Sequence, residues 1–136
     1  MNGISTLPLP ITATYAALLA LLVLLLAAVV IRLRRSFGVG LGDGGNHDLS
    51  RAIRVHGNAI ESVPLFLVLL AVYEINGGGT GVLHAFGAVF FLSRILHAWG
   101  LLSSSGVSPG RFYGTIGNGL CLLGLAIANL LKVLQG

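Results

Sequence analysis

Long apolar runs alternate with short polar or glycine-rich breaks along this chain of 136 residues. Four of the runs reach the length of about 20 mostly apolar residues that a membrane-spanning helix requires. With their flanking residues they predict helices over residues 11–35, 48–75, 81–103 and 109–134. The breaks read "FGVGLGDGGNHD", "NGGGTG" and "SSSGVSPGR", and their glycine, serine and proline residues end helices. The pattern therefore predicts an all-α integral membrane four-helix bundle, with residues 1–136 as a single domain.

Composition excludes a soluble globule. Hydrophobic residues make up 55% of the chain and charged residues 9%, whereas about 25% of the residues of a typical soluble domain are charged. The first apolar run has no basic segment before it and is followed by Arg32, Arg34 and Arg35, which indicates a retained helix and not a cleaved signal peptide. The formal charge of +4 comes from a few basic residues near helix ends, so no nucleic-acid partner is expected.

The uneven distribution of arginine and lysine over the loops predicts the orientation of the bundle. The first loop with its flanks and the third loop hold most of these residues: Arg32, Arg34, Arg35, Arg51, Arg54 and Arg111. The N-terminal tail and the second loop hold none, and Lys132 stands alone near the C-terminus. Because positive residues collect on the cytoplasmic side, we expect the first and third loops in the cytoplasm and both termini on the opposite side.

The second span begins with polar and charged residues that hydrocarbon rejects. At 1.5 Å per residue, Glu61 lies about 20 Å from the membrane surface near Glu74, within a slab about 30 Å thick. The same count along the third span places Arg94 at an equal depth. Since either charge alone would be costly at that depth, the sequence predicts an intramembrane Glu61–Arg94 ion pair.

One face of the second span collects the candidate binding residues. At 100° per residue, Arg51, Arg54, Asn58 and Glu61 form a single polar stripe, whereas His56 points almost the opposite way. An alternative is that the helix simply starts in the headgroup region, with its arginines reaching toward phosphates. That alternative stays open for Arg51 and is poor for Glu61, because a buried carboxylate gains nothing from anionic headgroups.

The same stretch resembles a known membrane family. "RAIRVHGNAIESVP" is similar to the second-helix signature of the membrane-associated proteins in eicosanoid and glutathione metabolism, the MAPEG family, with R-x-x-R, N-x-x-E and a following proline in register. "IRLRRSF", "SRILHAWG" and "SPGR" resemble the family's first-helix exit, third helix and last loop. "GDGG", "AIRVHGNAIE" and "LHAWG" are similar to a bacterial inner-membrane branch of the family, which implies that location and periplasmic termini.

The resemblance implies a homotrimer that binds glutathione between subunits near the cytoplasmic face. It implies a glutathione-dependent transferase or peroxidase acting on lipophilic small molecules from the surrounding lipid, with glutathione as co-substrate and no metal. The residues implied to bind glutathione are Arg32, Arg51, Arg54, Asn58, Glu61 and His97, with Arg94 paired to Glu61. Arg111 is implied to lie beside the glutathione sulfur as the catalytic residue. A free thiol has a pKa of about 8.5, and a neighbouring guanidinium favours its thiolate form. The ligand's ammonium needs an acceptor, for which Glu61 and Asn58 are both candidates.

Two departures from the family pattern leave the thiol-activating group open. Leu101 and Thr115 stand where several family enzymes carry tyrosines, and the serines at 103–105 are alternative donors to a thiolate. A glutathione- or lipid-binding protein without turnover therefore remains an alternative. A small four-helix exporter is a weaker one, because such exporters usually couple through a carboxylate in the first span and residues 11–31 carry no charged side chain. Cys121 lies in an apolar stretch and is predicted to be simply a small apolar residue.

Overall fold

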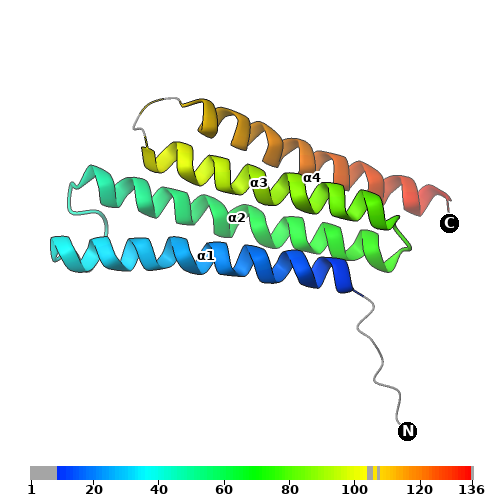
Figure 1. Ribbon diagram of the computed structural model, residues 1–136, viewed down its shortest axis with the longest axis horizontal. Coiled ribbons are helices and arrows are strands. Elements are labelled where there is room, and N and C mark those ends of the chain that lie inside the picture. Colours follow the sequence, from blue (N-terminus) through cyan, green and yellow to red (C-terminus); the bar gives the residue numbers. More distant parts are fainter. Residues whose placement is uncertain (1–8, 104–105, 107, 136) are drawn as a thin grey trace, which may run out of the picture.

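Four long helices make up the chain in the computed structural model, which describes residues 9–103, 106 and 108–135. They are α1 (Pro10–Phe37), α2 (His47–Ile75), α3 (Thr80–Ser103) and α4 (Pro109–Gln135). The helices lie side by side, and each runs antiparallel to the next (Figure 1). All four are long and apolar enough to cross a membrane. The predicted all-helical bundle with four membrane spans is therefore confirmed, and each helix begins and ends within two residues of its predicted limits.

The connections follow from ordinary helix-end chemistry. α1 ends at Gly38, whose φ of 66° is a left-handed conformation that suits glycine. The side-chain oxygen of Asn46 then accepts the backbone N–H groups of Asp48 and Leu49 and caps the start of α2. Between these ends, the Gly45 N–H donates to Asp43 and holds the pKa of that exposed carboxyl below its ordinary value. The α1–α2 connection thus places the N-terminal turn of α2 beside the end of α1.

The two ends of the bundle differ in the segments they gather. The α1–α2 connection, the end of α3 and the start of α4 lie at one end, and the α2–α3 turn and the end of α4 lie at the other (Figure 1). We call these the loop end and the turn end. Alternation of helix direction therefore brings together the helix ends that carry most of the arginines, as the charge pattern requires if both connections face the same side of a membrane.

The apolar core consists of two clusters along the bundle. The larger one lies toward the turn end and includes Phe66 and Phe90, whose rings stack with centroids 3.8 Å apart. The smaller one lies toward the loop end and joins α1, α2 and α3: Leu26, Val55, Ala59, Ala98 and Leu101. α1, α2 and α3 each contribute to both clusters, and the face of α2 that points away from them carries polar residues.

Small residues allow α3 and α4 to approach closely. A Cβ atom added at Gly114 would lie 2.6 Å from the backbone nitrogen of His97, and one added at Gly117 would clash with the hydroxyl of Ser93. Such contacts are typical of membrane helices, where association depends on close backbone packing instead of hydrophobic expulsion. The approach fixes the position of the first turn of α4, which carries Arg111, against the last turns of α3.

Candidate functional site

The outward face of α2 carries a polar pocket within its membrane-spanning segment. Arg54, Gly57, Asn58 and Glu61 line a cavity of about 240 Å³ there. The side chains of Arg54, Asn58 and Glu61 are exposed in the single chain, although α2 is one of the four spans. The structure thus brings together three of the four residues of the predicted stripe. We call this cavity the α2 pocket.

Behind the pocket, Arg94 reaches Asn58 from the interior of the bundle. The Arg94 side chain is 1% exposed, and its Nη1 donates to Oδ1 of Asn58 at 2.9 Å. Its Nε and Nη2 atoms have no hydrogen-bond partner among the described residues. One guanidinium group is therefore held inside a membrane protein with the amide oxygen of Asn58 as its protein acceptor.

The predicted Glu61–Arg94 ion pair is not formed. Within the described residues Glu61 makes no salt bridge, and the hydrogen bond from Arg94 goes instead to Asn58, about one turn closer to the loop end. The depth count placed Glu61 and Arg94 level with each other, but it counts backbone positions and leaves out the reach of a long side chain. Asn58 and Glu61 both lie on the exposed face of α2, and the buried guanidinium of Arg94 reaches the turn of α2 that carries Asn58.

Arg51 belongs to a different pocket from the rest of the stripe. It lies with Arg32 at the loop end, in a cavity of about 430 Å³ lined by Val29, Arg32, Leu33, Asp48, Arg51 and Leu102. Its Nη2 forms an ion pair with the carboxylate of Asp48, one turn earlier on α2. The structure therefore divides the predicted glutathione-binding arginines, with Arg54 in the α2 pocket and Arg32 and Arg51 in this second pocket between α1, α2 and α3.

His97 and Arg111 are linked through Thr115. The Nδ1 atom of His97 lies 3.1 Å from Oγ1 of Thr115, and that hydroxyl donates to the carbonyl of Arg111 at 2.8 Å. A hydroxyl has one hydrogen to give, so when Thr115 donates to the Arg111 carbonyl it can only accept from His97. Sequence reasoning treated Thr115 only as a missing tyrosine. Its spacing of four residues from Arg111 on one helix was the available signal.

Neither His97 nor Arg111 lines the α2 pocket in the single chain. His97 is 6% exposed and faces α4, where Gly114 packs against its backbone. Arg111 is half-buried in the first turn of α4, and its backbone N–H donates to the hydroxyl of Ser108, which caps the helix. The predicted catalytic residue therefore sits at a helix N-terminus at the loop end.

The alternative thiol-activating groups have other neighbours. Leu101 is buried in the smaller core cluster, and the hydroxyl of Ser103 donates to the Trp99 carbonyl at 2.7 Å. Ser104 and Ser105 lie outside the described residues. Among the described candidates, the hydroxyls of Ser103 and Thr115 already donate to backbone carbonyls. In this arrangement each hydroxyl can accept a hydrogen bond from another group but has no second hydrogen to donate.

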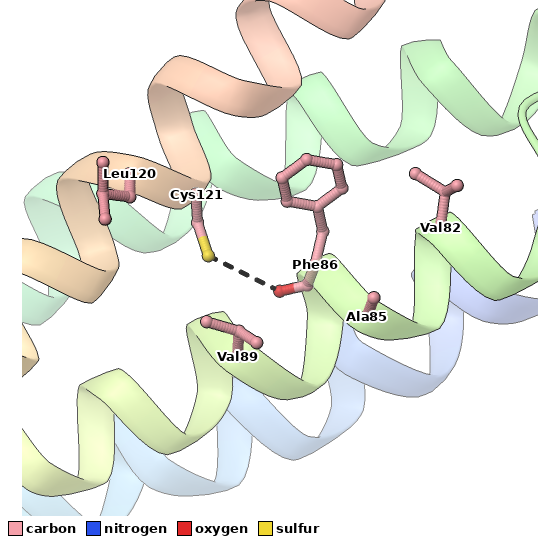
Figure 2. A pocket seen from close by; sticks show the side chains of 6 residues that line it. All are labelled: Val82, Ala85, Phe86, Val89, Leu120 and Cys121. Atoms are coloured by element: carbon pink, nitrogen blue, oxygen red, sulfur yellow. Dashed lines mark hydrogen bonds between the residues drawn. The ribbon is translucent and has the colours of Figure 1, made fainter.

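A separate apolar cavity of about 310 Å³ lies between α3 and α4 toward the turn end. Figure 2 shows four of its lining residues on α3 and two on α4: Val82, Ala85, Phe86, Val89, Leu120 and Cys121. The sulfur of Cys121 lies 3.9 Å from the carbonyl oxygen of Phe86. The residue Cys121 is 3% exposed. Cys121 is thus a buried member of the larger core cluster, consistent with the predicted small apolar residue, and the residues that line this cavity offer no charged group to a ligand.

Comparison with known proteins gives a consistent result over most of the chain. A model of the MAPEG family matches residues 12–131. The inner membrane protein YecN of Escherichia coli K12 is 42% identical over 90 residues, which cover 66% of this chain and 69% of that protein. An uncharacterized protein of Synechocystis, sll1147, is 33% identical over 123 residues, which cover 90% of this chain and 87% of that protein.

Proposed function

The chain belongs to the MAPEG family, which includes glutathione transferases, and from this premise we propose that it binds glutathione in the α2 pocket. We further propose that it joins glutathione through its sulfur to lipophilic electrophiles, or that two glutathione thiols form a disulfide as they reduce a lipophilic peroxide to an alcohol and water. The chain is an integral membrane protein with four apolar spans, and a relative is named an inner membrane protein. A substrate dissolved in lipid would therefore reach it by lateral diffusion.

The observation that carries this proposal is the composition of the α2 pocket. Glutathione has two carboxylates, one ammonium group and one thiol. The guanidinium of Arg54 can bind a carboxylate through two parallel hydrogen bonds, and the carboxylate of Glu61 can accept from the ammonium. Asn58 adds an amide between them along the same face of α2. Arg54 and Glu61 carry opposite charges and lie two turns apart on α2. Glutathione is a tripeptide with charges of both signs, so it matches this arrangement.

A homotrimer would explain why these polar groups lie on an outward face. Arg54, Asn58 and Glu61 are exposed in the single chain, and Glu61 is about 20 Å along α2 from Glu74 by the helical rise. Hydrocarbon rejects charged side chains at such depths, so this face requires a protein neighbour. In the assembly we propose, glutathione lies between subunits, and a neighbouring subunit brings the pocket of Arg32 and Arg51 toward it.

The proposed catalytic residue is Arg111. Its place in the first turn of α4 combines a guanidinium with the positive end of a helix dipole, and both favour a thiolate over a thiol. The thiolate would then form a carbon–sulfur bond with the electrophile. In a substitution the displaced electron pair departs with the leaving group, and in an addition it moves onto an atom of the electrophile that takes a proton from water. The loop end would face the cytoplasm, where glutathione is available.

The test is to assay the purified protein with glutathione and a panel of lipophilic electrophiles and peroxides. The proposal predicts turnover by the wild type. It predicts that Arg111→Ala keeps glutathione affinity but loses most turnover and the ultraviolet absorbance of bound thiolate. Glutathione binding without any turnover across the panel would instead support the non-catalytic alternative. That alternative is favoured by Leu101, which packs in the core at a position where the family resemblance implies a tyrosine in several enzymes.

A further inference from the structure

The hydrogen bond from Arg94 to Asn58 bears on which atoms of the Asn58 amide face a ligand. We infer that Arg94 is a positioning residue that turns the Asn58 amide so that its N–H donors, and not its oxygen, face the α2 pocket. Asn58 then binds a carboxylate, thiolate or carbonyl oxygen of the ligand, and Glu61 is the group that takes the ammonium. This inference rests on the proposed function, because it concerns the polarity of the proposed glutathione site.

The donor inventory of the two side chains fixes the direction of the amide. A guanidinium has five N–H donors and no acceptor. Since Nη1 of Arg94 lies 2.9 Å from Asn58, the atom that it contacts must be the oxygen Oδ1. The Nδ2 group is the other arm of the same planar amide. Asn58 lines the α2 pocket and is exposed there, so Nδ2 is the arm available to a ligand.

The burial of Arg94 makes this orientation hard to reverse. Arg94 is 1% exposed, and its Nε and Nη2 atoms have no partner among the described residues. Turning the amide over would place N–H donors against N–H donors and remove the acceptor that the guanidinium has in the chain. An unmatched polar group away from water is costly, and more so when it is charged. Asn58 therefore keeps its oxygen toward the interior.

The α2 pocket then has a defined polarity along the helix. Arg54 offers a cation, Asn58 offers neutral N–H donors, and Glu61 offers a carboxylate. The expectation that Asn58 shares the ammonium with Glu61 is replaced by a division of roles. Arg54 and Asn58 therefore bind hydrogen-bond acceptors on the ligand, and Glu61 binds its ammonium group.

The sign of the effect of Asn58→Asp on glutathione affinity tests the inference. The aspartate keeps an oxygen acceptor for Arg94, so the fold is retained, but it replaces the pocket's N–H donors with a second carboxylate oxygen. We expect glutathione affinity, measured by calorimetry on the full chain in nanodiscs, to fall at least tenfold. If Asn58 instead accepted from the ammonium, the aspartate would bind glutathione as tightly as the wild type or more so, and the inference would be overturned.

Variants of Arg94 separate positioning from a merely structural role. Arg94→Met removes the donor, and we expect glutathione to bind severalfold more weakly. The thermal midpoint of unfolding should not fall, because the substitution also removes a poorly partnered buried charge. Arg94→Lys keeps a donor and should restore most of the affinity. In an Asn58→Ala background, Arg94→Met should change the affinity no further. A lowered midpoint with equal losses in both backgrounds would show that Arg94 acts only on the fold.

An NMR measurement on the protein without ligand tests this inference independently of the proposed function. If the wild type binds no glutathione, the proposed function fails, and the Asn58 side-chain amide is then followed by NMR with asparagine labelling. The inference predicts that Arg94→Met moves the carbonyl carbon resonance of Asn58, since its oxygen loses a charged donor. An unchanged resonance would overturn the inference whatever the ligand.

Discussion

The carboxylate of Glu74, near the end of α2, caps the start of α1 by accepting the backbone N–H of Thr12 at 2.7 Å. Its other oxygen accepts the N–H of Ile11 at 2.9 Å. The residue before α1, Leu9, provides no side-chain cap. A helix start needs acceptors for its first N–H groups, and a carboxylate also interacts favourably with the positive end of the helix dipole. A residue 62 positions away thus ties α1 to the bundle at the turn end.

We predict that Glu74→Ala destabilises the protein by about 1–2 kcal/mol, the range observed when a helix cap is lost. Glu74→Gln should cost less, because an amide oxygen can still accept one of the two N–H groups. Reversible unfolding in mixed micelles measures both effects. The control is Glu61→Gln, which changes a carboxylate on the same helix that caps no helix end. Equal stabilities for the Glu74 and Glu61 variants would contradict the capping role.

A second prediction concerns the close approach of α3 and α4. Gly114→Ala places a methyl group 2.6 Å from the backbone nitrogen of His97, so we expect a loss of about 1–3 kcal/mol from overpacking. Gly119→Ala is the matched control on the same helix, where an added Cβ meets nothing within 4 Å. Alanine has a helix propensity up to about 1 kcal/mol better than glycine. Unfolding should therefore show opposite signs for the two substitutions, and equal signs would argue against the packing described.

A third prediction concerns the orientation in the membrane. Cysteine at position 41, where the native leucine is 93% exposed, reports on the loop end, and Gly79→Cys reports on the turn end. In bacterial spheroplasts, an impermeant maleimide should label Gly79→Cys at once and Leu41→Cys only after the membrane is opened. The native thiol, Cys121, is buried and serves as an unlabelled control. Labelling of Leu41→Cys in intact spheroplasts would reverse the proposed orientation.

Much of the fold follows from the sequence because hydrocarbon imposes a simple rule. A spanning segment must satisfy its backbone hydrogen bonds internally, so a long apolar run ending in glycine or proline has few alternatives to a helix. The proline at the start of α4 is such a residue. The cap of α2 is Asn46, whereas the sequence had offered Asp48 or Ser50 as its cap. The cap that Glu74 supplies to α1 was not foreseen, since it depends on the packing of two helices.

The candidate site was predictable in its residues but not in its contacts. Helical periodicity correctly grouped Arg54, Asn58 and Glu61. It could not determine which of them Arg94 would meet, because that depends on the rotation of α2 relative to α3 and on the reach of a long side chain. The same limit applies to Arg51, which turns to Asp48 and the second pocket. Contacts between helices require the crossing geometry, which sequence periodicity does not contain.

The most direct test of the account is the glutathione affinity of Arg54→Ala compared with that of Arg35→Ala. Both substitutions remove an arginine toward the loop end, but Arg54 lines the α2 pocket and Arg35 lines a different cavity at the end of α1. Loss of a hydrogen bond to a charged group costs about 1.5–3 kcal/mol, which is roughly a tenfold to hundredfold change in affinity. The account predicts that loss for Arg54→Ala and wild-type affinity for Arg35→Ala. Wild-type affinity in Arg54→Ala, or equal losses in both variants, would contradict it.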